Sequence, residues 1–210
     1  LMGGGDGSRD REGLLKHGGK WHCSEVWPPE GSQASPFYLH ETGFLSPEKP
    51  SEESSSTTYT YDPHNTVSSN GRCIIPYGPM KEEWHKGMGP RDQIEIETLP
   101  GHGVPGMPIA SRPDVLVFQT APLSEDVSIA GSIKGVLWIS SDAPDTDFFM
   151  KLIDVYPSSL DYPTGYAFPA SEGILRVRYR ESWERPSPME PGTVYRIEID
   201  MQPSANLFKA

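Results

Sequence analysis

Two stretches near the end of the chain decide the fold class. Residues 175–180 read Leu-Arg-Val-Arg-Tyr-Arg, and residues 195–201 read Tyr-Arg-Ile-Glu-Ile-Asp-Met. In both, apolar and charged residues alternate, which is the pattern of a β-strand with one buried and one solvated face. We predict that the two strands pair as an antiparallel hairpin, closed by a wide loop over 182–192 that holds three prolines.

The charged faces of these two strands are expected to meet. In this pairing Arg176, Arg178 and Arg180 face Glu198 and Asp200, and each opposite-charge pair contributes about 0.2–1 kcal/mol. Such a face is either plain solvated surface, which we favour, or a docking face for another domain.

Five stretches upstream also predict strands. Residues 127–140 alternate between apolar and polar, and residues 146–156 place Phe148, Met150 and Leu152 on one face. The unbroken apolar run at 115–118 predicts a strand that is buried on both faces. Shorter strands are expected over 36–40 and 57–61, where aromatic and β-branched residues lie between turn formers.

The composition agrees with an all-β fold. The 210 residues include 21 glycines and 22 prolines, and both residue types disfavour long helices. Many short strands joined by turns predict an antiparallel β-sandwich of jelly-roll type with long loops.

Charge and cysteine content exclude several function classes. The net charge of -11 and the lack of clustered Lys and Arg make nucleic acid and an anionic membrane surface poor partners. No apolar run approaches the roughly 18 residues of a membrane-spanning helix, and no leader pattern is visible. Cys23 and Cys73 could form one disulfide, but two separate thiols favour a cytoplasmic protein over a secreted one.

The sequence offers few candidates for catalytic or metal chemistry. It has no Gly-x-Ser-x-Gly elbow, and His17-Gly18-Gly19 is best interpreted as a flexible glycine turn. The histidines are scattered without the spacing of a zinc site. Asp142, Asp145 and Asp147 could bind calcium, but turn capping is the better interpretation. We therefore predict no metal and no cofactor.

The five tryptophans suggest a carbohydrate platform, because jelly rolls often stack sugars on exposed rings. Trp138 lies in an apolar run and is expected in the core. Trp21, Trp27 and Trp84 lie in loop-like segments, where they either present a binding surface or, more commonly, pin the loop to the domain.

Several segments resemble, in order and spacing, the C-terminal domain of X-Pro dipeptidyl-peptidase and cocaine esterase-like hydrolases. The signature-like segments are 141–148 (Ser-Asp-Ala-Pro-Asp-Thr-Asp-Phe), 151–157 (Lys-Leu-Ile-Asp-Val-Tyr-Pro), 172–182 (Glu-Gly-Ile-Leu-Arg-Val-Arg-Tyr-Arg-Glu-Ser) and 204–210 (Ser-Ala-Asn-Leu-Phe-Lys-Ala). Upstream, residues 1–5, 17–21, 25–29, 37–40, 59–63 and 89–93 resemble the segment through which that family's chain leaves the catalytic domain.

The resemblance implies a serine hydrolase of three parts: an α/β-hydrolase domain with a Ser-His-Asp triad, a helical cap, and a galactose-binding-like jelly roll packed on both. Residues 1–35 would be an extended segment leaving the hydrolase domain, and residues 36–210 a jelly roll truncated at its C-terminal end. The triad would precede residue 1, so no catalytic residue is assigned in this chain. The implied substrate is a small peptide or an ester, and the implied partners are the hydrolase and cap domains.

One loop is expected to border the substrate pocket of that enzyme. Where the family's turn usually reads Gly-Gly, this chain has Asn70-Gly71, followed by Arg-Cys-Ile-Ile-Pro-Tyr. The resemblance makes Ile74, Ile75 and Tyr77 the candidate pocket residues. The alternative is a stand-alone carbohydrate- or protein-binding β-sandwich. The sequence leaves a homo-oligomer open and does not choose between peptide and ester substrates.

Overall fold

The computed structural model describes residues 8, 9, 11, 13, 19, 21–51, 55–68, 70, 91–97 and 103–210. The chain divides into two units by the contacts within it. The first comprises Leu1–Ser32, Ser128–Asp154 and Ala170–Phe208, and the second comprises Gln33–Val127, Val155–Pro169 and Lys209–Ala210.

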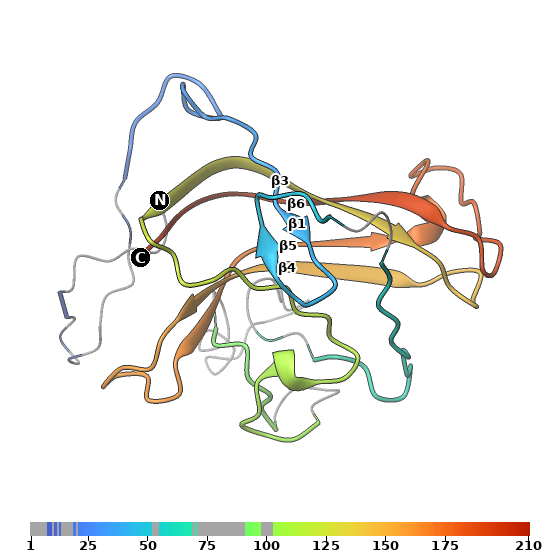
Figure 1. Ribbon diagram of the computed structural model, residues 1–210, viewed down its shortest axis with the longest axis horizontal. Coiled ribbons are helices and arrows are strands. Elements are labelled where there is room, and N and C mark those ends of the chain that lie inside the picture. The colour runs from blue at the N-terminus through green and yellow to red at the C-terminus, as the bar shows by residue number, and fades with distance from the viewer. Residues whose placement is uncertain are drawn as a thin grey trace, which may run out of the picture. The chain divides into compact units, whose positions relative to one another are not determined.

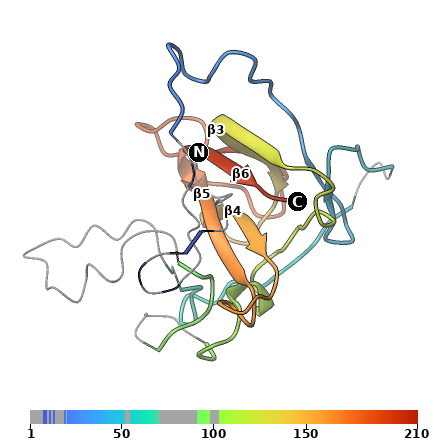
Figure 2. The ribbon, with the colours of Figure 1, turned by 90° about the vertical axis from the view of Figure 1, so that its left-hand side faces the viewer.

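Four long strands build the sheets. Strand β3 (Val127–Ile139) pairs with β6 (Tyr195–Phe208), and β4 (Asp147–Tyr156) pairs with β5 (Tyr166–Arg176). Within the first unit the two pairs form two layers, as Figures 1 and 2 show from perpendicular directions. Two short strands, β1 (Tyr38–Leu39) and β2 (Leu45–Ser46), form a separate antiparallel pair in the second unit.

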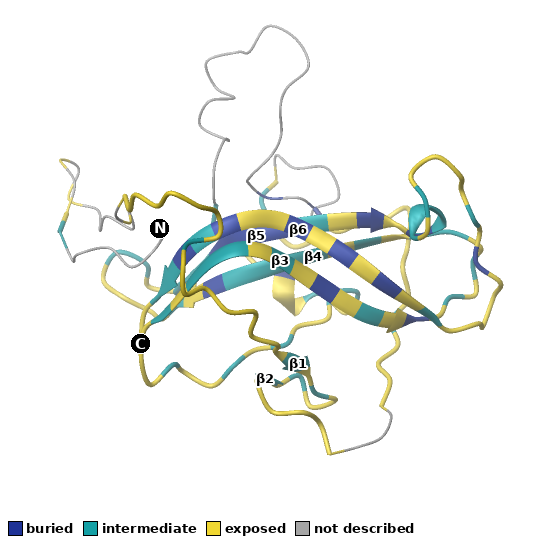
Figure 3. Ribbon diagram, turned by 90° about the horizontal axis from the view of Figure 1, so that it is seen from above, coloured by how far each residue is buried: buried dark blue, intermediate teal, exposed yellow. Residues whose placement is uncertain are grey.

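The core of the first unit lies between the two layers. Its buried members are Ile139, Leu175, Val177, Met189, Ile197 and Ile199, with Leu137, Phe148, Met150 and Tyr195 packed against them. Buried and exposed residues alternate along β3 and β6, which Figure 3 shows as bands. The prediction of an all-β sandwich is confirmed, as is the inward apolar face of 127–139.

The predicted hairpin between 175–180 and 195–201 is wrong. Strand β5 ends at Arg176, and the chain turns into a 3₁₀ helix, η2 (Val177–Tyr179). A 3₁₀ turn repeats every three residues, so the alternating pattern there does not mark a strand. The backbone N–H of Val177 donates to the carbonyl of Thr146 at 3.0 Å, which ties this turn to the start of β4 and not to β6.

The predicted charge pairing therefore differs as well. Nε of Arg176 lies 2.8 Å from Oδ1 of Asp147, and Nη1 of Arg178 lies 3.4 Å from Oδ2 of Asp145. On the other sheet, Lys134 of β3 lies within 3.5 Å of both Glu198 and Asp200. Arg180 is nearly buried, and its guanidinium lies 4.3 Å from the centroid of the Tyr195 ring. Of these contacts, the pairs of Arg176 with Asp147 and of Lys134 with Glu198 and Asp200 join neighbouring strands of one sheet.

Two other strand predictions fail. Residues 115–118 form no strand, and Leu116 and Val117 are exposed. Residues 57–61 form no strand either, whereas 36–40 is confirmed in part by β1. An apolar run identifies a buried strand only where a partner strand covers it, and the chain near 115–118 makes one isolated bridge, Phe44 with Gln119.

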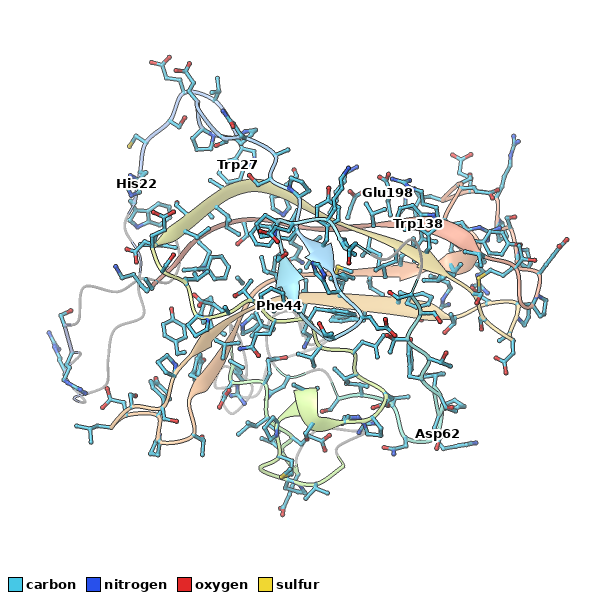
Figure 4. The ribbon with its side chains drawn as sticks, in the orientation of Figure 1. His22, Trp27, Phe44, Asp62, Trp138 and Glu198 are labelled. Carbon is cyan, nitrogen blue, oxygen red and sulfur yellow. The ribbon has the colours of Figure 1, made fainter. Side chains whose placement is uncertain are left out.

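The prediction that Trp138 lies in the core is also wrong, because the side chain is 68% exposed. Leu137 and Ile139 point inward, so Trp138 between them must point outward. Its ring lies 5.9 Å from the guanidinium carbon of Arg196, and Figure 4 shows it on the same side of the β3–β6 ribbon as Glu198.

The sequence predicted no membrane-spanning helix and left a disulfide between Cys23 and Cys73 open. No helix in that part has the length and apolar character needed to cross a membrane. Cys23 is an exposed free thiol, and Cys73 lies outside the described residues.

Candidate pocket-border site in the second unit

The predicted pocket residues Ile74, Ile75 and Tyr77 lie outside the described residues. The chain is described on either side of them, at Asn70 and again from Arg91 to Glu97. The described part of the candidate site therefore consists of these flanking residues and of the residues that they contact in the second unit.

The side-chain amides of Asn70 and Gln93 join the two flanks. Nδ2 of Asn70 donates to the carbonyl oxygens of Asp92 at 2.7 Å and Ile94 at 2.9 Å. Nε2 of Gln93 donates to the carbonyls of Asn70 at 2.7 Å and Arg91 at 2.9 Å. Both side chains are buried, so the amides satisfy backbone groups that have little access to water.

A short backbone ladder fixes the second flank. The N–H of Ile109 donates to the carbonyl of Gln93 at 2.9 Å, and the N–H of Glu95 donates to the carbonyl of Met107 at 2.8 Å. Ile94 forms an antiparallel bridge with Pro108. Ile109 begins a 3₁₀ helix, η1 (Ile109–Ser111), and its side chain is buried. Residues 93–95 are thus held against 106–109.

Asp92 connects the flank to a group of aromatic rings. Its Oδ1 accepts a hydrogen bond from the N–H of Ala167 at 2.9 Å. The neighbouring Tyr166 packs against three rings, those of Tyr156, Tyr162 and Phe168, with centroids 4.9 to 6.5 Å away. Burial, and next the nearby Tyr162 and Asp92, raise the pKa of Tyr166 above its ordinary value of 10.0.

A buried arginine ties three further segments to the same region. Arg112 is bidentate to Asp114, with both N–O distances at 2.8 Å, and its Nη1 lies 3.3 Å from Oε1 of Glu95. Its Nη2 also donates to the carbonyl of Asn65 at 2.7 Å. The Glu95 side chain is 2% exposed and also accepts a hydrogen bond from the N–H of Gly103. We call Arg112, Glu95 and Asp114 the arginine cluster.

A local turn brings Asn65 to the arginine cluster. Oδ1 of Asp62 accepts from the N–H of His64 at 2.8 Å, and the carbonyl of Asp62 accepts from the N–H of Asn65 at 3.1 Å. This is the Asx turn typical of an Asp-Pro pair. Asp62 itself is labelled in Figure 4. Its role is structural, because it reverses the chain so that the Asn65 carbonyl meets Arg112.

The arginine cluster shifts two pKa values. The hydrogen bonds from Arg112 hold the pKa of Asp114 below its ordinary value of 3.8, although burial opposes them. Burial, followed by the charge of Asp114, raises the pKa of Tyr59. The first shift is that of a carboxylate hydrogen-bonded to a guanidinium. The second is that of a phenol whose ionisation is opposed by burial and by a neighbouring carboxylate.

The lowered pKa of Asp114 predicts an acid-dependent stability. A carboxylate whose pKa is depressed by folding stabilises the fold at high pH and loses that contribution as pH falls through its folded pKa. We expect the difference in free energy of unfolding between the protein and Asp114→Asn to be largest at neutral pH. It should shrink as the pH falls from about 5 to about 2.5. Urea unfolding across this range measures it, and a difference that does not change with pH would contradict the assignment.

Two of the three carboxylates considered for calcium have other partners in the structure. Asp147 pairs with Arg176, and Oδ1 of Asp145 accepts from the backbone N–H of Arg178 at 3.0 Å. Among the described residues, no group of three or more His, Cys, Asp or Glu could hold a metal ion. His17 and Gly18 lie outside the described residues.

Among the described tryptophans, Trp21, Trp27, Trp138 and Trp183 are exposed, and Trp84 lies outside the described residues. Trp183 was not predicted to lie on a binding surface. Its ring stacks on Tyr179, with centroids 6.5 Å apart and planes inclined by 19°. The polar contacts of Asn70, Gln93 and Arg112 were missed too, because their partners are up to 47 positions apart in the sequence. Only the Asp-Pro turn before Asn65 gave a local signal.

The fold and these contacts define a class: a β-sandwich domain whose buried amides and ion pairs hold long loops in place. The chain belongs to the family of X-Pro dipeptidyl-peptidase C-terminal non-catalytic domains, whose family model matches residues 2–210.

Named relatives extend this finding. The chain is 33% identical over 198 residues to cocaine esterase from Rhodococcus sp. (strain MB1 Bresler), a match that covers 90% of this chain and 30% of the esterase. Among solved structures it is similar to an aminopeptidase from a marine sediment Thaumarchaeota archaeon, with a TM-score of 0.71, 27% identity and coverage of 96% and 30% of the two chains. An α-amino acid ester hydrolase gives a TM-score of 0.64, 26% identity and coverage of 94% and 30%. The chain spans about 30% of the length of each relative.

Proposed function

We propose that this chain is the accessory β-sandwich of a longer serine hydrolase, that it packs on the hydrolase and cap portions, and that Ile74, Ile75 and Tyr77 border the substrate pocket. One observation carries the proposal: the chain is matched over 90% of its length but spans only 30% of a relative named as an esterase. The family is described as non-catalytic. The chemistry is therefore assigned to the remaining part of the longer protein.

The reaction we propose is acyl transfer to serine. In this chemistry a histidine base takes the serine proton, an acyl-enzyme forms as the leaving group departs, and water then releases the acid. The leaving group is an alcohol for an ester and an amine for a peptide. The names of the relatives include both an aminopeptidase and ester hydrolases, so small peptides and small esters are both candidate substrates.

Labelling with a fluorophosphonate tests where the nucleophile lies. The reagent forms a covalent bond with an activated serine, which requires an adjacent base. We expect the full-length protein to be labelled and to hydrolyse an activated ester, and the 210-residue chain to do neither. Heat-denatured full-length protein is the control for non-specific labelling. A labelled 210-residue chain would place the nucleophile here and contradict the proposal.

Substitution of the pocket residues tests the border. In the full-length enzyme, Ile74→Asp and Ile75→Asp are expected to change KM, because each puts a charge where apolar substrate contacts are proposed. Leu160→Asp is the matched control, since Leu160 is exposed in the second unit and belongs to no proposed site. Kinetics that remain equal to the parent enzyme in both isoleucine variants would exclude the border.

A second candidate function rests on the exposed aromatic rings. The stacked pair of Tyr179 and Trp183 offers an indole face of the kind that binds sugars. Under that alternative the domain binds carbohydrate whether or not it is attached to an enzyme. Quenching or a shift of tryptophan fluorescence by an oligosaccharide, lost in Trp183→Ala, would favour it over the pocket-border function.

A further inference from the structure

We propose that Asn70 and Gln93 are positioning residues, which act as an amide clasp that fixes both ends of the segment between them. The inference rests on the proposed function, because that segment contains the three candidate pocket residues. Its own evidence is the geometry of the described residues on either side.

The amide clasp is reciprocal. Asn70 donates to two carbonyls on the far flank, those of Asp92 and Ile94, and Gln93 donates back to the carbonyl of Asn70. Three hydrogen bonds therefore connect positions that are 22 to 24 residues apart. Asn70 is 3% exposed and Gln93 is 7% exposed, so water is poorly placed to replace these bonds.

The chemistry of these contacts requires amides. Each clasp nitrogen meets two carbonyl oxygens, and a primary amide is a neutral group that supplies two N–H donors from one nitrogen. A carboxylate of the same shape would set oxygen against oxygen, and a methionine would offer no donor. The clasp is thus specific enough to be broken without changing the size of the side chain.

The amide clasp is anchored to the body of the second unit. Ile94 bridges to Pro108, Asp92 accepts from the N–H of Ala167, and Glu95 contacts Arg112. The far flank therefore has a fixed position, and Asn70 is fixed relative to it. Substrate contacts depend on such placement, because a gap of about 0.5–1 Å already forfeits a quarter to a half of a dispersion contact.

Kinetics of the full-length enzyme test the clasp. For Asn70→Asp and Gln93→Met we expect KM to rise about tenfold while kcat stays within about twofold, because substrate binding is weakened and the triad is left intact. Asn206→Asp is the matched control: Asn206 is a fully buried asparagine of the first unit whose Nδ2 donates to Asp154 at 3.2 Å. It should lower the melting temperature without raising KM.

The outcomes separate the clasp from the proposed function. If Asn70→Asp and Gln93→Met keep the parent KM at a temperature where circular dichroism shows them folded, the clasp is overturned. If Ile74→Asp nevertheless raises KM in the same experiment, the proposal that Ile74 borders the substrate pocket still stands. If none of these variants changes KM, both proposals fail. A rise in KM for Asn206→Asp as large as that for Asn70→Asp would also overturn the clasp, since general destabilisation would then explain both.

Discussion

Replacing Arg112 with methionine is expected to lower the free energy of unfolding by about 3–5 kcal/mol. Methionine keeps much of the volume of the arginine stem but leaves Glu95 and Asp114 without their cation. Glu95 is almost completely buried, and a buried carboxylate without a partner is strongly destabilising. Chemical denaturation at neutral pH measures the loss.

Arg176→Met is the matched control for this experiment. Arg176 also forms a two-point pair with a carboxylate, that of Asp147, at the same 2.8 Å distances, but both partners are more than a third exposed. A solvated pair contributes little to stability, because water and salt screen the attraction, so we expect a much smaller loss for Arg176→Met. Equal losses in the two variants would show that the arginine cluster is not the buried ionic centre described above.

Replacing Gly173 with alanine is expected to cost about 3 kcal/mol, at the upper end of the range for overpacking. A Cβ at this position would lie 2.6 Å from the carbonyl oxygen of Asp200 and 3.0 Å from the Cα of Met201. Both are backbone atoms of β6, so no rotamer change relieves the contact, and the strands must separate. Thermal or urea unfolding of the variant measures the cost.

Gly192→Ala serves as its control. Gly192 has a φ of 78° and no atom within 4 Å of an added Cβ, so alanine there meets only a conformational penalty of about 1–2 kcal/mol. The expected order of destabilisation is Gly173 above Gly192. The reverse order would mean that the close approach between β5 and β6 is relaxed easily.

The part of the fold that follows from local periodicity could be predicted. Residues 127–139 and 195–201 alternate, and their apolar members Ile139, Ile197 and Ile199 lie in the core. The partner of each strand could not be predicted this way, because alternation marks a face and says nothing of which strand lies beside it. Arg176 could be assigned to Glu198 or to Asp147 with equal charge complementarity, and only the three-dimensional pairing selects Asp147.

Resemblance to a family suggested where in the chain to place the candidate site, and the contacts described there could not be predicted from the sequence. Asn70 reads as a turn residue in the sequence, and nothing local indicates that its amide reaches Asp92 and Ile94. Arg112 similarly contacts Asn65, Glu95 and Asp114, which come from different parts of the sequence. Such contacts depend on which loops lie next to each other in the folded chain. Neither the hydrophobic periodicity nor the composition of the sequence indicates this.

The amide clasp also suggests that the segment between Asn70 and Gln93 can be replaced by a different one. Because Asn70 and Gln93 meet one another, the residues between them begin and end at neighbouring points, whatever their number. Closing a longer loop is cheap, since each doubling of length costs only about 0.6 kcal/mol. If the segment borders a substrate pocket as proposed, grafting segments of other lengths and compositions between these two amides is a route to altered substrate preference.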